Sequence, residues 1–376
     1  MNIIILHSSS DLYGASKVLL VVSKTYIENG HTVTVVLSEE GSLAKELRLL
    51  QADVHIIQLG ILRKKYYSLT GIINRGYILA NAFFALRKLV KQKKTDLIYS
   101  NTLAVLIGAF VAKSTGKKHI WHVHEIIEKP KILFNFLGWS LSHFCDKAIV
   151  VSTAVFNHWK KKVPAEKLQL IYNGFDYTRL SHPSPALRNE LSIPENKIII
   201  ATVGRIHYWK GQNYFLEIAA SLSKKYSHLE FLIVGDVFPG YEYLYTELNQ
   251  LIESFGLQQS VHFLGFRKDI LSLYPSFDIF LLPSLLPDPF PTVILEAMAA
   301  GIPVVATQQG GAVEMLQDGV TGILIPIGDP AKAANRMESL INDKEIRNRM
   351  GAMAKERVET EFSLAAFQEA MIKLVQ

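Results

Sequence analysis

Two successive series of short apolar runs rich in β-branched residues constrain this 376-residue chain more than any other feature. The first series extends from IIIL at 3–6 to LQLIYN at 168–173, and the second extends from KIIIATVG at 197–204 to GILIPI at 322–327. Most runs are continuously apolar, which is typical of parallel strands covered by helices on both faces. Helical patterns separate them, for example at 14–29, 211–226, 241–255 and 292–300. The sequence therefore predicts an α/β fold with two doubly wound domains.

A stretch without sustained apolar periodicity separates the two series at residues 174–196. It contains three prolines, which interrupt helices and are common in linkers. We therefore predict an N-terminal domain over 1–180 and a C-terminal domain over 181–360. The remaining residues, 361–376, are expected to form a helix that packs back on the N-terminal domain. Ligands of open parallel sheets bind beyond the carboxyl ends of the strands, so we expect a site in a cleft between the domains.

Positive charge is concentrated in the first half of the chain, although the formal net charge is only +6. Residues 1–180 hold 24 Lys and Arg against 12 Asp and Glu, and the remaining residues hold 16 against 22. The stretch 61–95 contains nine basic residues and no acidic one, interleaved with aromatic and aliphatic side chains. This pattern favours a helix or helix pair lying on an anionic membrane surface. The alternative is a solvated basic face whose apolar side packs on its own domain, and no accompanying motif indicates nucleic-acid binding.

Cysteine content and hydropathy indicate the cellular compartment in which the protein is expected. Cys145 is the sole cysteine, so neither a disulfide framework nor a cysteine metal cluster can form within the chain. The first apolar run has no basic region before it and is predicted to be a buried strand rather than a signal peptide. No apolar stretch reaches the roughly 18 residues that a spanning helix needs. We therefore expect a cytoplasmic protein that attaches to the inner face of a membrane if 61–95 binds lipid.

Two acids bracket a loop and a helix in the stretch PSLLPDPFPTVILEAMAAG at 283–301. Asp288 lies in a proline-rich loop after an apolar strand, and Glu296 lies within the helix that follows. Carboxylates accept hydrogen bonds from sugar and ribose hydroxyls, and the free N–H groups at a helix start suit an anion or polar ligand. In the alternative interpretation, Asp288 forms a turn and Glu296 faces solvent. The apolar residues around Glu296 weigh against solvent exposure at that position.

Two cations lie five residues apart in the strand–loop–helix segment VGRIHYWKGQNYFLEIA at 203–219. Arg205 and Lys210 precede a helix that begins after Gly211. A guanidinium forks to two phosphate oxygens and an ammonium acts as a point charge, so this segment predicts a diphosphate site. Taken alone, the loop would more often hold two exposed cations.

Glycines mark other junctions in the second half. Gly310 and Gly311 stand ahead of a helical pattern, where backbone N–H groups can approach phosphate or sugar oxygens. The alternative is a flexible turn. Gly235 in VGD and Gly265 in FLGF end two further predicted strands.

The first half of the chain offers one loop and one histidine pair. The segment 7–20 is a strand–loop–helix junction that contains Gly14 but lacks G-x-G-x-x-G, which argues against an NAD-dependent dehydrogenase. WHVHEIIEKP at 121–130 places His122 and His124 at a strand end. A histidine in this position is more often structural. A zinc site would need a third ligand at suitable spacing, which is not evident.

Together these motifs closely resemble those of the retaining glycosyltransferases of family 4, whose GT-B fold joins two Rossmann-like domains. The stretch 283–301 is similar to the acid-x7-acid signature of that family, with Asp288 where a glutamate is usual. By this resemblance, Asp288 faces the hydroxyls of a donor sugar and Glu296 binds the ribose of the nucleotide. Because aspartate is one methylene shorter than glutamate, the contact with the sugar is expected to differ from the family norm.

The other motifs match the same family. Arg205 and Lys210 correspond to its phosphate-binding loop, which implies that they neutralise the departing diphosphate. His124, followed by an acid, matches a histidine that faces the reacting sugar, and His122 is the alternative. The further donor-binding positions that the resemblance implies are Gly14, Gly204, Gly235, Gly265, Phe266, Phe290, Thr292, Gly310 and Gly311.

The resemblance implies transfer of a sugar, with retention of configuration, from a UDP-sugar or GDP-sugar to a saccharide or lipid-linked acceptor, as in cell-surface polysaccharide biosynthesis. The residues expected to act in catalysis are His124, Arg205, Lys210 and Asp288. No metal or other cofactor is expected, because the cations serve the diphosphate and the chain has no D-x-D motif. The alternatives are a nucleotide-sugar epimerase on the same fold and a non-catalytic nucleotide-sugar-binding protein.

Overall fold

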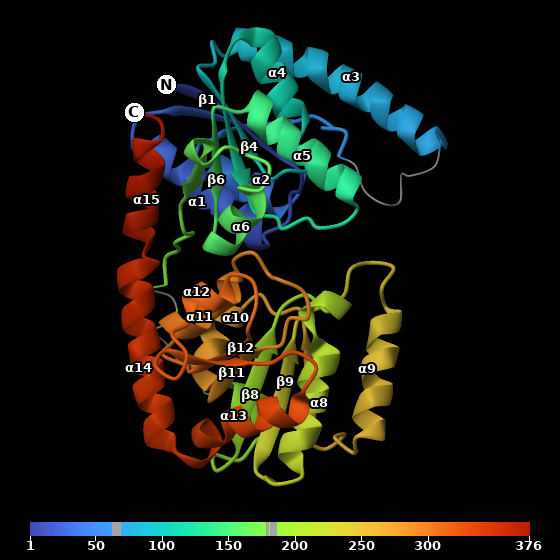
Figure 1. The fold of residues 1–376 in the computed structure, drawn as a ribbon, viewed down its shortest axis with the longest axis vertical. Helices are drawn as coiled ribbons and strands as arrows, with labels where there is room; N and C mark the ends of the chain where they lie inside the picture. Colours follow the sequence, from blue (N-terminus) through green and yellow to red (C-terminus); the bar gives the residue numbers. More distant parts are fainter. Residues whose placement is uncertain (62–68, 178–179, 181–185) are drawn as a thin grey trace. The chain divides into compact units, whose positions relative to one another are not determined.

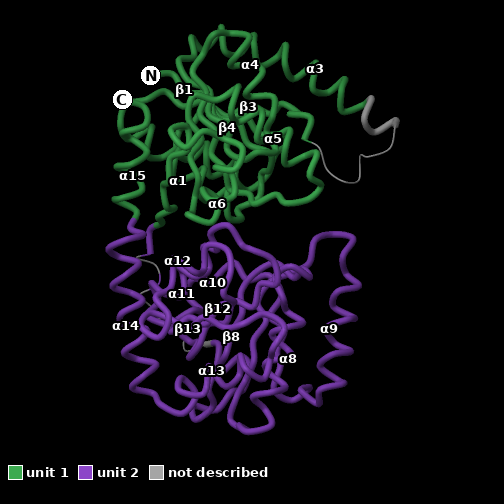
Figure 2. Tube along the Cα trace, in the orientation of Figure 1, with its two compact units in different colours: residues 1–175, 364–376 green, residues 176–363 purple. Residues whose placement is uncertain are grey.

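Two parallel sheets organise the protein, each within its own compact unit (Figures 1 and 2). The computed structural model describes residues 1–61, 69–177, 180 and 186–376. Unit 1 contains Met1–Phe175 and Leu364–Gln376, and unit 2 contains Asp176–Ser363. The predicted α/β class with two doubly wound domains is confirmed.

Unit 1 is built on a seven-stranded sheet in the order β3-β2-β1-β4-β5-β6-β7, in which every pairing is parallel. Its central strands are buried almost throughout, as expected for continuous apolar runs covered on both faces. The strands are β1 Asn2–His7, β2 Thr32–Leu37, β3 Asp53–Ile56, β4 Leu97–Asn101, β5 Lys118–Val123, β6 Lys147–Val150 and β7 Leu168–Leu170.

Helices cover both faces of this sheet. One face carries α1 Gly14–Glu28 and α2 Ser42–Leu49, together with α15 Leu364–Lys373, which packs against α1. The other face carries α3 Leu69–Gln92 and α4 Ile107–Thr115, and α5 packs beside α4. The remaining helical segments are α5 Lys131–Phe144, α6 Thr153–Trp159 and η2 Ala165–Lys167.

Unit 2 is built on a six-stranded parallel sheet in the order β10-β9-β8-β11-β12-β13. The main core of the unit packs α8, α9 and α13 against one face of the sheet, and α11 packs against α14. The strands are β8 Ile198–Val203, β9 Leu229–Val234, β10 Val261–Gly265, β11 Ile279–Leu282, β12 Val304–Thr307 and β13 Gly322–Ile325. The helical segments are α7 Ala186–Glu190, η4 Tyr208–Lys210, α8 Gln212–Ser223, α9 Tyr243–Ser254, α10 Ile270–Leu273, η5 Tyr274–Ser276, α11 Thr292–Ala299, α12 Ala312–Met315, α13 Pro330–Asn342 and α14 Lys344–Glu361.

The basic stretch 61–95 contains the whole of α3, and residues 62–68 of the stretch lie outside the described part of the chain. Its apolar side packs into unit 1 through Ala82, Leu86 and Leu89, which are buried. Tyr77 and Phe84 remain exposed. Across the described residues, no helix is long and apolar enough to cross a membrane.

We predict that Met371→Ala destabilises unit 1 by about 2–5 kcal/mol, because deleting a fully buried side chain removes its burial energy and leaves a cavity. Hydrogen exchange in α1, against which α15 packs, should accelerate. The matched control Lys373→Ala, at an exposed position of the same helix, should change stability by less than about 0.5 kcal/mol. Equal acceleration in α14 for Met371→Ala would contradict this local effect.

Candidate functional site

Backbone groups from three strand ends meet at the carboxyl edge of the sheet in unit 2. The Gly204 N–H donates to the carbonyl of Val234 at 2.9 Å, and the Gly235 N–H donates to the carbonyl of Gly265 at 2.8 Å. A Cβ atom at Gly235 would lie 1.9 Å from the Gly204 carbonyl oxygen, so a side chain at 235 would push these strand ends apart. Three of the predicted site glycines therefore lie side by side, at the end of a sheet where α/β proteins bind ligands.

The loop that carries the two predicted cations is fastened to the end of β11. It contains the single turn η4, and Gly211 then begins the approach to α8. A Cβ atom at Gly211 would lie 2.0 Å from the Pro283 carbonyl oxygen. The Leu285 N–H donates to the Trp209 carbonyl at 2.8 Å. These contacts bring the 203–219 segment to the 283–301 segment.

Lys210 and Asp288 are joined directly by this arrangement. The Lys210 ammonium donates to the Asp288 carboxylate, and both side chains are more than two-thirds buried. Arg205 lies on the same loop, with its guanidinium carbon 3.4 Å from the centre of the Phe238 ring. The sequence motifs give Lys210 and Asp288 separate roles, whereas in the structure the two side chains form an ion pair with each other.

The Gly310–Gly311 turn supports the loop that contains Asp288. A Cβ atom at Gly310 would lie 2.3 Å from the Asp288 carbonyl oxygen, and one at Gly311 would lie 2.4 Å from that of Pro289. The Gly311 N–H also donates to the Asp288 carbonyl at 2.8 Å. Close backbone packing therefore requires glycine at both positions, which a flexible turn would not.

Glu296 is buried in α11, with 7% of its surface exposed. The Tyr274 hydroxyl donates to its carboxylate at 2.8 Å. Burial, and then the nearby carboxylate, raise the pKa of Tyr274 well above its usual value, so this hydroxyl keeps its proton and remains a donor. Glu296 is therefore a buried hydrogen-bonded acid, and the solvent-exposed alternative is wrong.

The neighbouring predicted positions differ in exposure. Thr292 opens α11 and is partly exposed. Phe290 is buried, with its ring centre 5.9 Å from that of Phe362, whereas Phe266 is 54% exposed beside Gly265. Phe290 therefore belongs to the packing that holds the Asp288 loop, and Phe266 is the aromatic side chain that a ligand at this edge could reach.

In unit 1, the carboxyl ends of β1, β4 and β5 carry a chain of hydrogen bonds. His7 Nδ1 lies 2.9 Å from the Asn101 carbonyl oxygen, and His124 Nε2 lies 3.1 Å from Asn101 Oδ1. Asn101 Nδ2 donates to the Ala15 carbonyl, which fixes the amide orientation and makes His124 Nε2 the donor. The sequence motifs do not single out His7 and Asn101, although both directly follow predicted strands, and the strand of Asn101 pairs with that of His7 on one side and with the one before His124 on the other.

Burial keeps His124 neutral. Desolvation, with the neighbouring His122 and His7, lowers the pKa of His124 well below its usual value. Since Nε2 donates to Asn101, the lone pair of the neutral ring is on Nδ1. His122 is fully buried, contacts the Tyr99 hydroxyl at 2.7 Å and has its pKa lowered to about 3 by desolvation. Of the two histidines, only His124 is partly exposed.

Glu125 accepts hydrogen bonds from the backbone of two segments, the one that follows β4 and the one that follows β5. Its carboxylate lies 3.1 Å from the Leu103 N–H and 2.9 Å from the His124 N–H. Desolvation raises the pKa of Glu125 to about 7, and the backbone donors act in the opposite direction. The acid therefore orients the backbone of His124. Gly14, the remaining predicted position of unit 1, begins α1 and has nothing within 4 Å of where a Cβ atom would lie.

Two further observations concern ligands. Among the described residues, no group of three or more His, Cys, Asp or Glu side chains is arranged to hold a metal ion.

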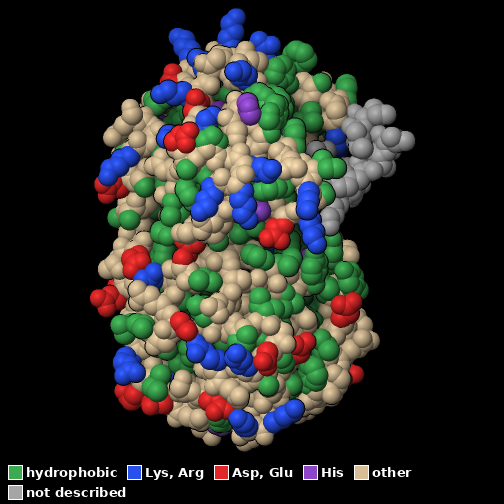
Figure 3. Space-filling model, in the orientation of Figure 1, with side chains coloured by type: hydrophobic (Ala, Val, Ile, Leu, Met, Phe, Trp, Pro, Cys, Tyr) green, Lys and Arg blue, Asp and Glu red, His purple; other side chains and the backbone are tan. Residues whose placement is uncertain are grey.

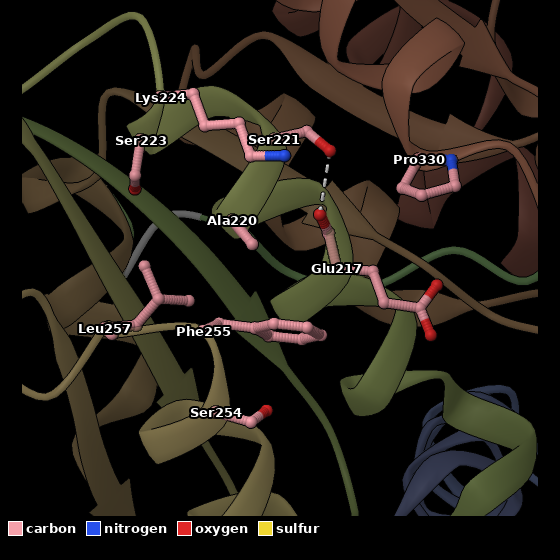
Figure 4. Close-up of a pocket in the computed structure, with 10 residues that line it drawn as sticks. Glu217, Ala220, Ser221, Ser223, Lys224, Ser254, Phe255, Leu257 and Pro330 are labelled. Carbon is pink, nitrogen blue, oxygen red and sulfur yellow. Dashed lines mark hydrogen bonds between the residues drawn. The ribbon is translucent and has the colours of Figure 1, made fainter.

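A cavity of 610 Å³ lies at the far end of α8 and α9, where Glu217, Ser221, Lys224 and Phe255 line it (Figure 4). It contains none of the predicted site residues, so the candidate site is defined by the strand-end contacts.

Comparison with known sequences gives matches in both halves. Residues 13–179 match the sequence profile described as Glycosyltransferase Family 4, and residues 183–357 match that of Glycosyl transferases group 1. A D-inositol 3-phosphate glycosyltransferase of Corynebacterium kroppenstedtii is 34% identical over 209 residues, which are 54% of this chain and 46% of that enzyme. The chain thus matches less than half the length of that relative.

Two other relatives match over more of their length. An α-1,4-N-acetyl-D-galactosaminyltransferase of Campylobacter jejuni, whose name gives an undecaprenol-linked saccharide as acceptor, is 27% identical over 298 residues, 78% of each chain. The crystal structure of Anabaena Alr3699/HepE in complex with UDP and glucose superposes with a TM-score of 0.86 and 26% identity, covering 99% of this chain and 98% of that one.

We predict that Glu125→Gln changes how stability depends on pH. Burial raises the pKa of Glu125 in the folded protein from its usual 4.5 to about 7, so the folded protein holds one more proton than the unfolded chain between these pH values. The wild type should therefore lose stability relative to Glu125→Gln as pH rises through this window, and the loss should be complete above it. Urea unfolding of both proteins across the window measures this, and parallel pH profiles would contradict the prediction.

Proposed function

Since this chain belongs to the group 1 glycosyltransferases of family 4, we propose that it moves a sugar from a nucleoside diphosphate sugar to a saccharide or lipid-linked acceptor. The observation that carries the proposal is the contact between the Arg205/Lys210 loop and the Asp288 loop at the carboxyl edge of unit 2. This contact supports the proposal because Lys210, on the loop that also carries Arg205, lies beside Asp288. Cations suit a diphosphate, and an acid suits sugar hydroxyls.

We propose that Arg205 and Lys210 bind the diphosphate and stabilise the negative charge that grows on it. The bond between the anomeric carbon and the β-phosphate oxygen breaks, and the acceptor oxygen bonds to the same carbon from the same face. The proton of the acceptor hydroxyl passes to the departing phosphate. Preorganised cations favour this step because the developing charge needs no solvent rearrangement. Since these side chains supply the positive charge, we propose transfer without a divalent cation.

Asp288 has two roles in this proposal. Without donor it neutralises Lys210, which avoids leaving a mostly buried ammonium unpaired. When a diphosphate binds Lys210, the carboxylate becomes available to accept from a sugar hydroxyl. We propose that Glu296 accepts from a ribose hydroxyl while it keeps the Tyr274 hydroxyl as its second partner. In unit 1, the neutral His124 ring is held by Asn101 with Nδ1 available to accept from a sugar hydroxyl.

For the donor we propose a UDP-sugar. Support comes from the Anabaena protein, which was crystallised with UDP and with UDP-glucose and matches nearly the whole chain. For the acceptor, support comes from the Campylobacter relative, whose name gives as acceptor a saccharide linked through a diphosphate to undecaprenol. We accordingly propose a role in assembling cell-surface glycans from lipid-linked intermediates.

The nearest alternatives use the same donor site. A nucleotide-sugar epimerase would convert the donor sugar in the absence of any acceptor, and a non-catalytic binding protein would bind the donor and form no product. Incubation with donor alone, followed by analysis of the sugar nucleotide, separates the epimerase from the transferase. Within 61–95, α3 exposes Arg87, Lys88 and Lys91, and this positive charge supports attraction of the chain to an anionic membrane surface.

We predict that uridine diphosphate raises the melting temperature of unit 2 more than guanosine, adenosine or cytidine diphosphate at equal concentration. A ligand that binds only the native state stabilises it in proportion to the logarithm of its concentration over Kd. A thermal-shift series with the four nucleotides measures the order. A larger rise in melting temperature with guanosine diphosphate would contradict the proposal of a UDP-sugar and indicate a GDP-sugar.

We predict that Lys210→Ala lowers transfer activity by at least about 100-fold, because it removes one of the two positive charges that stabilise the departing diphosphate. It also leaves Asp288 without its cation, so Lys210→Ala/Asp288→Asn should fold as well as the wild type and remain inactive. The control is Lys224→Ala, at an exposed lysine beside the cavity in Figure 4, which should keep full activity. Full activity in Lys210→Ala, measured as release of nucleoside diphosphate, would refute the phosphate assignment.

A further inference from the structure

Helix α5 in unit 1 exposes an apolar stripe along one side. Ile132, Phe136 and Trp139 are 82%, 39% and 48% exposed, and their spacing of four and three residues places them on one face. Leu137 and Leu141 of the same helix are buried. Figure 3 shows hydrophobic side chains at the surface over α5, with Lys and Arg side chains around them. A soluble helix normally directs its polar side to water, so this exposed stripe indicates a binding surface.

The stripe continues across ring contacts to the next helix. The ring centres of Phe136 and Trp139 lie 6.3 Å apart, and Trp139 lies 5.1 Å from Phe144. Phe144 in turn lies 5.4 Å from Phe110 of α4, which is 40% exposed. The exposed apolar side chains therefore form one connected patch and are not scattered single residues.

A basic pocket adjoins the patch at the start of α5. Lys131, Lys161 and Lys162 line a cavity of 340 Å³ whose sole acidic lining residue is Glu128. The Lys162 ammonium lies 5.8 Å from the centre of the Phe134 ring, and its stem packs on α5 at Gly138. Among the described residues, none of the ion pairs includes these three lysines.

The combination of positive charge and exposed apolar side chains indicates which kind of partner binds the α5 surface. An ammonium cluster with a single acid suits phosphate, and exposed tryptophan and isoleucine suit the boundary between headgroups and acyl chains. A second copy of this chain would bring two identical lysine clusters together across a two-fold axis, which like charges oppose. The α3 surface also presents basic groups, and it packs Ala82, Leu86 and Leu89 into unit 1, so it supplies mainly electrostatic attraction, although Tyr77 and Phe84 are exposed.

We propose that α5 is the membrane-docking surface of this protein: Ile132, Phe136 and Trp139 enter the interface of an anionic bilayer, and the lysine pocket binds a phospholipid headgroup phosphate. Docking of this kind would bring unit 1 to the plane where a lipid-linked acceptor resides. The inference does not depend on sugar transfer, because binding to vesicles can be measured without donor or acceptor.

The test uses the full chain and vesicles of phosphatidylcholine with or without phosphatidylglycerol. Wild-type protein should sediment with the anionic vesicles, and its tryptophan emission should shift to shorter wavelength as Trp139 leaves water. Ile132→Ser/Phe136→Ser should lose most binding. Lys161→Gln/Lys162→Gln, which keeps the stems nearly intact, should bind about 25-fold more weakly, since each interfacial lysine is worth about fivefold.

Controls separate this surface from others. Phe255→Ser/Val320→Ser, at exposed apolar positions of unit 2, should bind vesicles like the wild type. Lys210→Ala should also bind normally, so loss of transfer and loss of docking are distinguishable. Circular dichroism and binding of uridine diphosphate should be unchanged in the α5 variants, which shows that they fold.

Three results would overturn the proposal. The first is equal binding to vesicles with and without phosphatidylglycerol. The second is loss of binding in Arg87→Gln/Lys88→Gln while the α5 variants bind normally, which would assign the contact to α3. The third is a wild-type dimer in analytical ultracentrifugation that Ile132→Ser/Phe136→Ser dissociates, which would assign the stripe to a second copy. Inorganic phosphate at millimolar concentration should compete weakly, and complete displacement would assign the pocket to a free anion.

Discussion

Contact of backbone against backbone fixes the candidate site in unit 2. The strand-end loops approach one another so closely that a Cβ atom at Gly235 or Gly310 would lie within 2.3 Å of a carbonyl oxygen of the neighbouring loop. Such contacts tolerate no side chain and little movement. The Lys210–Asp288 pair joins residues 78 positions apart in the chain, and the close contacts of Gly211 with Pro283 and of Gly310 with Asp288 bring their loops together. The ion pair of the site therefore forms only because glycines, which have no side chain, occupy the positions where the loops meet.

In unit 1 the strand ends are held by neutral polar groups instead. Asn101 connects His7 and His124, and burial keeps both histidines uncharged near neutral pH. Glu125 is also close to losing its charge through burial. A neutral polar edge suits hydroxyl groups, whereas the edge of unit 2 carries the charges suited to a diphosphate.

The sequence predicts much of this arrangement because periodicity and loop chemistry are local properties. The parallel strands, the helices between them and the motifs at the strand ends all follow from patterns within about twenty residues. Pairings between distant segments do not follow, which is why the Lys210–Asp288 contact, the Tyr274–Glu296 hydrogen bond and the role of Asn101 emerge only from the fold. Helix α5 shows the same limit. Its sequence KILFNFLGWSLSHF is apolar on nearly every side, so periodicity cannot tell which residues remain outside.

The placement of α15 has a consequence for how the chain acquires its structure. Phe367 and Met371 complete the core of unit 1, yet they follow all of unit 2 in the sequence. During synthesis from the N-terminus, unit 2 has its whole segment available before unit 1 does. The surface of unit 1 that α15 covers therefore stays exposed to water until α15 is made. Unit 1 is therefore the later of the two to become complete, and its stability depends on a helix that follows all of unit 2 in the sequence.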